Sequence, residues 1–225
     1  MLYVSNSLRF PFGVITQIII LLVLMATGYE KTIRENLNRI YSKETETLTL
    51  AKNLPASREG LIFKFRALGE ETTLSPEGIS LSGKPDLGPR GLLISLYALH
   101  ATSEPSKLEP FKAFKDFPDS MPYQNAFSAN SERVLVPHVP RIHASMSRIL
   151  PSFQGEKNPG SLPGDFSLLL FPFPKIALCY VFYLQDEDFP ASAICLFSSN
   201  ALFFMPLDGL ADVAEYSSRK IVELL

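Results

Sequence analysis

Downstream of Met25, apolar residues recur at the period of an α-helix. The apolar residues that share one face of this helix are Tyr29, Ile33, Leu37, Ile40 and Tyr41. Thr27 and Glu30 have the spacing of a capping box, with threonine at the N-cap and glutamate three residues later. The pattern predicts an amphipathic helix that begins immediately after Met25 and continues, with less regular spacing, toward Leu54.

Beyond this helix, short patterned segments alternate with glycine and proline. Residues 61–66 alternate around Lys64 and predict a strand, and residues 78–81 predict the strand that returns beside it. Pro89 opens a largely buried helix, because proline is tolerated in a first helical turn. Residues 122–133 and 142–150 are expected to form further helices.

After Asp165 the pattern changes to strands. The predicted strands are residues 166–171, 176–184, 194–197 and 202–205, preceded by a glycine-rich and proline-rich loop at 155–164. Both faces of the second strand are apolar, so it is expected to be a central strand covered on both sides. Asp208 is expected to cap a terminal helix. The fold is therefore predicted to be α+β, with an antiparallel or mixed sheet, packed helices and the C-terminal helix docked on the sheet.

Residues 1–26 form an apolar N-terminal segment, and residues 27–225 are expected to form a single α+β domain. One interpretation is a signal peptide or membrane anchor, in which residues 10–28 make the only membrane contact and the protein is exported or anchored. The other interpretation is an over-extended start. Translation would then begin at Met25, and the protein would be cytoplasmic.

The composition indicates a globular protein with a sizeable core, since 46% of the 225 residues are hydrophobic and 20% are charged. The net charge of −2 and the scattered lysines and arginines lack the basic excess of a nucleic-acid binder, so no nucleic-acid partner is expected. Cys179 and Cys195 lie in apolar runs without CxxC spacing, which favours buried thiols. A disulfide between the two would require a suitable strand register.

The main candidate site is the acidic turn, defined as Asp186, Glu187, Asp188, Phe189 and Pro190, which joins two predicted strands. Extended backbone there would place Asp186 and Asp188 on one side, which suits a calcium or magnesium ion, or an acid–base pair. Asp165 is a further candidate ligand. We nevertheless favour a turn whose acids are simply solvated, because the sequence identifies no further residues that would complete a metal or catalytic site. For Asp165 we favour a hydrogen bond to the neighbouring backbone. The sequence identifies no cofactor and no particular metal.

A proline-rich stretch at residues 102–118 carries regularly spaced aromatic residues. Phe114, Phe117 and the following Tyr123 are candidate aromatic contacts for a ligand. The more ordinary role for such residues is to pin a loop onto the core, since aromatic side chains dominate core packing.

Taken together, these features resemble an uncharacterised prokaryotic family known as domain of unknown function 3786, over about residues 28–225. The acidic turn carries the most distinctive part of the resemblance. The other matching segments are Gly164-Asp165, Phe173-Pro174, Leu196-Phe197, Met205-Pro206, the leucine-rich run 91–99, and Phe114-Lys115-Asp116-Phe117-Pro118 leading to Tyr123. The resemblance implies a shared fold, and because the family has no settled activity it implies no particular reaction.

The chain also departs from the family pattern. Gln185 stands where a glycine usually precedes the acids, and Ser198 stands where an aspartate follows Leu-Phe. If the acids of the family jointly hold a cation, the loss of the carboxylate at 198 weakens that site here. The cysteine-rich, iron–sulfur-type segment of some relatives is missing. Relatives typically begin near the first amphipathic helix, which favours Met25 as the start.

No standard catalytic signature occurs, whether GxSxG, HExxH, a Walker loop or a dinucleotide fingerprint. This favours a non-enzymatic binding or accessory module for a small ligand or a protein partner. The alternative is a metal-dependent enzyme that uses Asp186 and Asp188, with Asp165 or His138 as further ligands.

Overall fold

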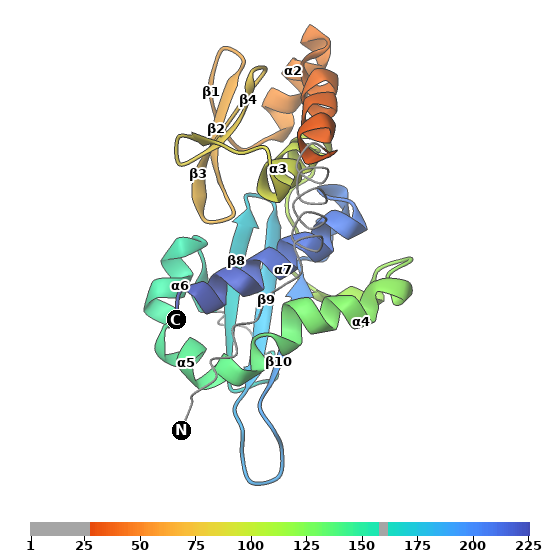
Figure 1. Cartoon of the computed structure of the whole chain (residues 1–225). Coiled ribbons are helices and arrows are strands. Elements are labelled where there is room, and N and C mark those ends of the chain that lie inside the picture. The colour runs from red at the N-terminus through yellow and green to blue at the C-terminus, as the bar shows by residue number, and fades with distance from the viewer. Residues whose placement is uncertain (1–27, 158–161) are drawn as a thin grey trace, which may run out of the picture.

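A computed structural model describes residues 28–157 and 162–225, and it places two antiparallel sheets in two lobes of the molecule (Figure 1). The N-terminal lobe comprises residues 28–99, and the C-terminal lobe comprises residues 112–225. The apolar segment 1–26 and the proposed N-cap Thr27 lie outside the described residues. Within the described part of the chain, none of the helices has both the length and the hydropathy needed to cross a membrane.

The N-terminal lobe begins with the predicted amphipathic helix, which occupies residues 28–41. Its apolar stripe faces inward, and Ile33, Leu37 and Ile40 are buried, as the spacing predicted. After a break the chain forms helix α2, a five-stranded meander and the buried helix α3. The elements are α2 (Glu44–Asn53), β1 (Ser57–Glu59), β2 (Ile62–Ala67), β3 (Glu70–Ser75), β4 (Gly78–Leu81), β5 (Lys84–Pro85) and α3 (Pro89–Leu99).

The C-terminal lobe is built on a second sheet whose strands follow the order β6-β10-β9-β8-β7. The strands are β6 (Lys112–Ala113), β7 (Glu156–Lys157), β8 (Phe166–Phe173), β9 (Ile176–Tyr183) and β10 (Ser192–Phe197). Short helical turns connect β6 to β7, and they are η1 (Phe114–Asp116), η2 (Met121–Tyr123), α4 (Gln124–Phe127), η3 (Ser128–Arg133), η4 (Val136–His138), α5 (Val139–Ala144) and α6 (Met146–Ser152). After β10 come η5 (Ala201–Phe203) and the C-terminal helix α7 (Leu207–Glu223). The α+β prediction is confirmed, with two antiparallel sheets in place of the one expected.

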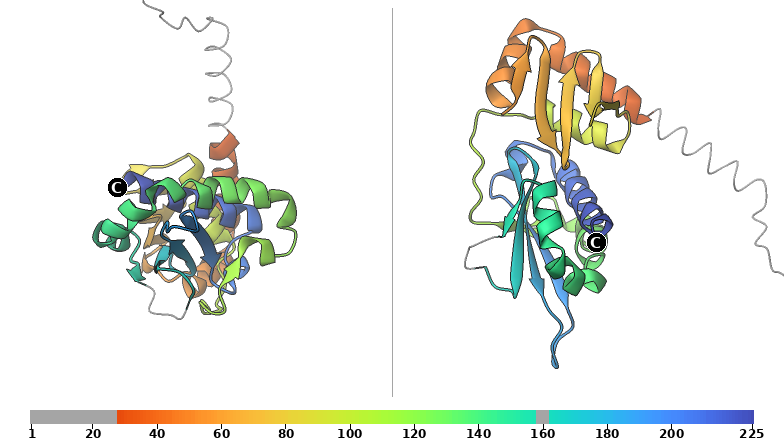
Figure 2. Two further views of the ribbon diagram at one scale, coloured as in Figure 1. Left: turned by 90° about the horizontal axis from the view of Figure 1, so that it is seen from below. Right: turned by 90° about the vertical axis from the view of Figure 1, so that its left-hand side faces the viewer.

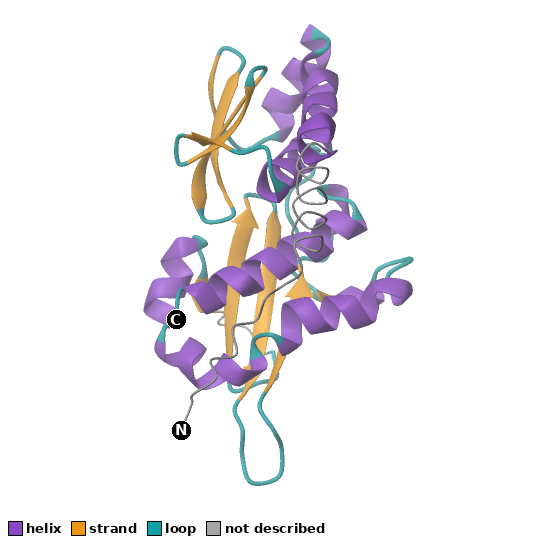
Figure 3. Ribbon diagram, viewed as in Figure 1, coloured by secondary structure: helices purple, strands orange, loops and turns teal. Residues whose placement is uncertain are grey.

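Strand β9 is covered on both faces, as its uninterrupted apolar sequence predicted. One face, which includes Tyr180, joins the main core beneath α7. The opposite face packs against Leu108 and Phe111 of the segment that connects the lobes. Helices therefore cover one side of this sheet and extended chain covers the other (Figures 2 and 3).

The register of β9 and β10 determines whether Cys179 and Cys195 can form a disulfide. Cys195 pairs with Tyr180, and Cys179 pairs with Leu196. Because successive side chains of a strand point to opposite faces, the two sulfur atoms lie on opposite sides of the sheet. Both cysteines are buried, and they do not form a disulfide.

Three local predictions are wrong. Residues 202–205 are not a strand, because η5 forms one tight turn that buries Ala201. Asp208 is not the N-cap of the last helix, since that position belongs to Pro206 and Asp208 sits in the first turn. The loop expected at 155–164 begins with β7, an edge strand paired with β8.

The lobes meet where β2 turns into β3 against the end of β8. The backbone N–H of Leu68 donates a 2.6 Å hydrogen bond to the carbonyl oxygen of Pro172. Nearby, the ring centroids of Tyr97 and Phe173 are 4.6 Å apart. Buried residues of both lobes belong to one continuous apolar cluster. The junction is therefore packed and hydrogen-bonded.

Candidate functional site

The acidic turn projects from the end of the β9–β10 hairpin, at the bottom of the molecule in Figure 1. Its three acids are exposed to solvent. The Asp186 Oδ1 accepts hydrogen bonds from the backbone N–H groups of Asp188 (2.9 Å) and Phe189 (2.7 Å), so this carboxylate closes its own loop. The Phe189 side chain is 70% exposed.

Asp165 lies beside the base of the same hairpin. Its Oδ2 accepts a 2.6 Å hydrogen bond from the backbone N–H of Leu184, and its own N–H donates to the carbonyl of Phe182. The structure therefore brings Asp165 near the acidic turn and gives its carboxylate a backbone partner. His138 is half-buried in η4, which precedes α5 in the chain.

A metal site needs several ligands that converge. Among residues 28–157 and 162–225, no group of three or more His, Cys, Asp and Glu side chains is arranged to hold a metal ion.

The three candidate aromatic residues differ in burial, since Phe114 and Phe117 are buried in the core, at 1% and 4% exposed, and Tyr123 lies at the surface. The Phe117 ring is buried edge-on against Phe197, with centroids 5.5 Å apart. Phe114 stacks on Phe127 at 4.2 Å, with the rings nearly parallel. Tyr123 is 59% exposed. Phe114 and Tyr123 come together as walls of one cavity, which Phe117 does not line.

This cavity of about 230 Å³ lies between α7 and the helical turns of η1, η2, α4 and η3. Its aromatic wall is Phe114, Tyr123 and Phe127, and its polar wall is Asn130, Ser131, Asp208, Asp212 and Glu215. A second cavity of about 300 Å³ adjoins it toward α3 and the first helix, and both are lined by Asp212 and Glu215. We call the two together the α7 groove. Its residues were not singled out as candidates from the sequence, apart from Phe114 and Tyr123.

The acidic side of the α7 groove comes from helical spacing. Asp208, Asp212 and Glu215 are separated by four and then three residues, which places them on one face of α7. The Glu215 carboxylate accepts a 2.9 Å hydrogen bond from the Asn130 Nδ2 and pairs with Arg219 at 2.5 Å. Asp208 bonds the backbone N–H of Gly209.

Asp212 stands between these two acids without a hydrogen bond or ion pair to any other described residue. Partial burial raises the pKa of the Asp212 carboxyl, and the nearby carboxylates of Glu215 and Asp208 raise it further. Like charges three and four residues apart on a helix repel each other. The cavity beside Phe114 is thus lined by three carboxylates and no basic side chain, and one of these carboxylates, Asp212, has no ion-pair partner among the described residues.

The opposite wall is formed by η3, a single wide turn of π-helix. Such turns are rare and occur frequently at functional sites. Three consecutive residues of η3 each form a hydrogen bond to another element. The Asn130 Nδ2 donates to the Glu215 carboxylate, and the Ser131 carbonyl accepts from the Ser218 Oγ. The Glu132 Oε1 accepts from the backbone N–H of Cys195. The Ser131 Oγ is completely buried and has no hydrogen-bond partner among the described residues.

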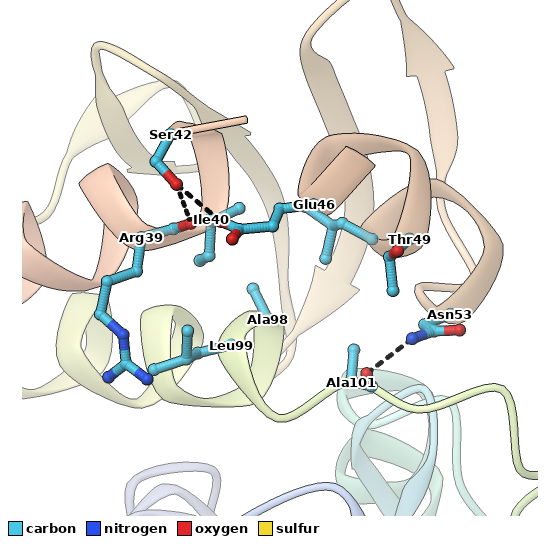
Figure 4. Close-up of a pocket in the computed structure, with 10 residues that line it drawn as sticks. Arg39, Ile40, Ser42, Glu46, Thr49, Asn53, Ala98, Leu99 and Ala101 are labelled. Atoms are coloured by element: carbon cyan, nitrogen blue, oxygen red, sulfur yellow. Dashed lines mark hydrogen bonds between the residues drawn. The ribbon is translucent and has the colours of Figure 1, made fainter. Parts of the chain in front are cut away.

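A separate cavity of about 340 Å³ lies in the N-terminal lobe, between the first helix, α2 and α3 (Figure 4). Much of its polar lining is already engaged within the protein. The Ser42 Oγ lies 2.7 Å from the Glu46 Oε2, and the Asn53 Nδ2 donates to the carbonyl of Ala101 at 2.9 Å. Arg39 lies at its rim with Ile40 and Leu99 beside it (Figure 4).

The sequence provided only weak evidence for the α7 groove, in the spacing of its acidic residues. Acids at 208, 212 and 215 are on the polar face of a helix whose other face is apolar, a pattern typical of any solvated helix surface. Ser131 had no distinguishing neighbour in the sequence. The wide turn of η3 and its packing on α7 are what convert these residues into a site.

The chain belongs to the family described as a domain of unknown function (DUF3786), whose model matches residues 46–220. No curated protein and no solved structure matches the chain. The match contains every residue that lines the cavity beside Phe114. The cavity in Figure 4 draws partly on Arg39, Ile40 and Ser42, which precede the matched range.

Proposed function

We propose that the protein is a non-enzymatic binding module that takes a positively charged group of its ligand or partner into the α7 groove. The observation that carries this proposal is Asp212, a carboxylate without a partner among the described residues, held between two other acids. Besides burial, the carboxylates of Glu215 and Asp208 raise the pKa of Asp212, and the same negative charges favour a cation in the cavity.

The lining matches a cation that donates several hydrogen bonds. Asp208, Asp212 and Glu215 offer carboxylate oxygens, and the buried Ser131 Oγ offers an acceptor that is otherwise unsatisfied. A guanidinium or ammonium group carries donors and no acceptor. A buried polar atom left without a hydrogen bond costs about 1–3 kcal/mol, so a ligand that supplies one gains affinity.

The aromatic wall supports the same ligand class. Tyr123, at 59% exposed, is the accessible ring of this wall, and Phe114 and Phe127 form a stacked pair that is almost fully buried. Aromatic faces attract cations, by about 0.5–1 kcal/mol at exposed sites and more when the pair is desolvated. Carboxylates on one side and rings on the other therefore suit a flat or compact organic cation.

The experiment is a titration with methylguanidinium chloride, followed by NMR chemical shifts of backbone amides. Saturable shifts are expected at residues 130–131 and 211–215. Methylurea, a neutral molecule of similar shape, is expected to cause none. Asp212→Asn is expected to weaken methylguanidinium binding at least tenfold.

The matched control is Asp188→Asn, which removes the same charge from the exposed acidic turn and is expected to bind like the wild type. The proposal fails if methylguanidinium leaves the groove amides unshifted, or if Asp212→Asn binds it as tightly as Asp188→Asn does.

A further inference from the structure

We infer that the occupant of the α7 groove is a segment of a partner protein, with an arginine or lysine side chain in the cavity beside Phe114 and apolar residues next to it. This rests on the proposed function and adds the class of partner.

The first reason is the length of the groove. Its lining runs along α7 from Leu207 to Arg219. At a rise of about 1.5 Å per residue, this stretch of helix is roughly 18 Å long. An extended peptide rises about 3.3 Å per residue, so roughly five residues span the groove. A single small cation fills only the half beside Phe114.

The second reason is the apolar rim. Tyr123 lines the cavity and is 59% exposed, and Met121 in the same turn is 73% exposed. Exposed aromatic and methionine side chains next to a pocket are typical of protein contact surfaces, where aromatic anchors carry much of the binding free energy. An isolated cation in the cavity leaves this rim in water, whereas an apolar neighbour in a peptide covers it.

The third reason is that basic side chains line only one end of the groove. Asp212 and Glu215 line both cavities, Asp208 lines only the cavity beside Phe114, and Arg90 and Arg219 line only the adjoining cavity. Arg90 is already paired with Glu70 at 2.6 Å and Asp86 at 2.7 Å, and the 66% exposed side chain of Arg219 pairs with Glu215. A partner segment is therefore oriented by its basic residue, and a neutral or acidic residue is favoured toward Arg219.

The buried hydroxyl of Ser131 supports an inserted side chain independently of the acids. It is nine-tenths buried or more, lines the cavity, and lacks a hydrogen-bond partner among the described residues. A long basic side chain can carry its N–H donors toward Ser131 while its methylene stem contacts the exposed ring of Tyr123.

The test compares three probes on the full chain by calorimetry. They are a five-residue peptide library, a matched library with citrulline in place of arginine, and acetyl-arginine amide. The first library has arginine fixed at the second position, apolar residues at the first and third, and glutamate at the fifth. We expect it to bind at least tenfold more tightly than acetyl-arginine amide. The citrulline library is expected to lose that affinity.

Variants separate this inference from the proposed function. Met121→Ala is expected to reduce the library affinity toward that of acetyl-arginine amide while methylguanidinium still binds, because Met121 is 73% exposed in the rim and does not line the cavity. Phe203→Ala, which removes a 53% exposed aromatic side chain outside the groove, is expected to change neither. If the library binds no more tightly than acetyl-arginine amide while methylguanidinium binds, the partner class is wrong and the cation site stands. If methylguanidinium does not bind either, both proposals are wrong.

Discussion

The Tyr180 hydroxyl lies 2.9 Å from the Ser218 Oγ, in the completely buried space between β9 and α7. The Ser218 Oγ in turn donates a 2.6 Å hydrogen bond to the carbonyl of Ser131, and the Tyr180 hydroxyl is also 3.1 Å from the carbonyl oxygen of Ala214. This short network joins the central strand, the terminal helix and the π-turn η3. It thereby holds together the two walls of the α7 groove, although neither Tyr180 nor Ser218 lines it.

Tyr180→Phe is expected to lower the free energy of unfolding by about 1–2 kcal/mol, because it removes a buried hydrogen bond and leaves the ring packing unchanged. Burial raises the pKa of Tyr180 well above its ordinary value, so the hydroxyl stays protonated as a donor. Urea denaturation measures the change. Tyr123→Phe, which alters an exposed tyrosine, is the control and is expected to lose less than about 0.5 kcal/mol. Equal losses in the two variants would contradict the role given to the network.

Gly69→Ala is expected to disrupt the junction of the lobes. Gly69 has φ of +82°, and a Cβ there would lie 2.7 Å from the carbonyl oxygen of Ser152. Gly83→Ala is the matched control, because its φ is +77° and no atom lies within 4 Å of the added Cβ. Left-handed backbone costs an alanine about 1–2 kcal/mol in either variant, and the clash adds about 1–3 kcal/mol at Gly69 alone. Similar melting temperatures for the two variants would show that the backbone at Gly69 and Ser152 can move apart without loss of stability.

Asp212→Asn is expected to stabilise the unliganded protein at neutral pH, although it removes a residue proposed to bind the partner. The substitution relieves repulsion from Asp208 and Glu215, worth about 0.2–0.5 kcal/mol for each pair on an exposed helix. Thermal denaturation is expected to show a melting temperature higher by about 1–2 °C. Asp188→Asn is expected to leave it unchanged. A lower melting temperature for Asp212→Asn would indicate that the carboxylate has a stabilising partner.

The stability gained by Asp212→Asn is also expected to depend on pH. Because the pKa of Asp212 is raised in the folded protein, the native state keeps its proton to a higher pH than the unfolded chain does. This group therefore makes the wild type less stable as the pH rises from the ordinary aspartate value of 3.8 through the raised native pKa. The advantage of the variant should be absent below that window, grow across it and then level off. Urea denaturation at a series of pH values tests this, and an advantage that does not change with pH would refute it.

Asp186→Ala is expected to loosen the acidic turn without unfolding the protein. It removes the acceptor of the N–H groups of Asp188 and Phe189, both in an exposed loop. Amide hydrogen exchange at these two residues should become faster, while exchange in β9 and β10 stays the same. Glu187→Ala is the control from the same turn and is expected to leave these rates unchanged. Unaltered exchange in Asp186→Ala would mean that the turn is held by other contacts.

The fold was predictable wherever one element buries one continuous apolar pattern. The stripe from Ile33 to Ile40 predicted the first helix, and the apolar run of β9 predicted a strand covered on both faces. Residues 202–205 were misassigned because a short apolar run has no period that separates a strand from a single buried turn. The division into two sheets was missed because periodicity within a strand does not say which strands pair.

The candidate site was less predictable for a related reason. The acidic turn is conspicuous along the chain because its carboxylates are adjacent, and in space it is an exposed hairpin end whose Asp186 bonds its own loop. The α7 groove is inconspicuous along the chain because its walls come from Phe114, from η3 and from α7, far apart in sequence. Phe114 and Tyr123 were named as aromatic contacts, yet the acids opposite them were not.

By itself the sequence determined the fold class, the double covering of β9 and the hairpin that carries the acidic turn, because each follows from local apolar spacing and turn residues. The tertiary structure alone decided that Cys179 and Cys195 face opposite sides of the sheet, and that Asp212 stands opposite Ser131 and Phe114. These relationships depend on strand register and on the packing of η3 against α7. The register and this packing are set by contacts between segments distant in sequence, and such contacts produce no periodic pattern of apolar residues along the chain.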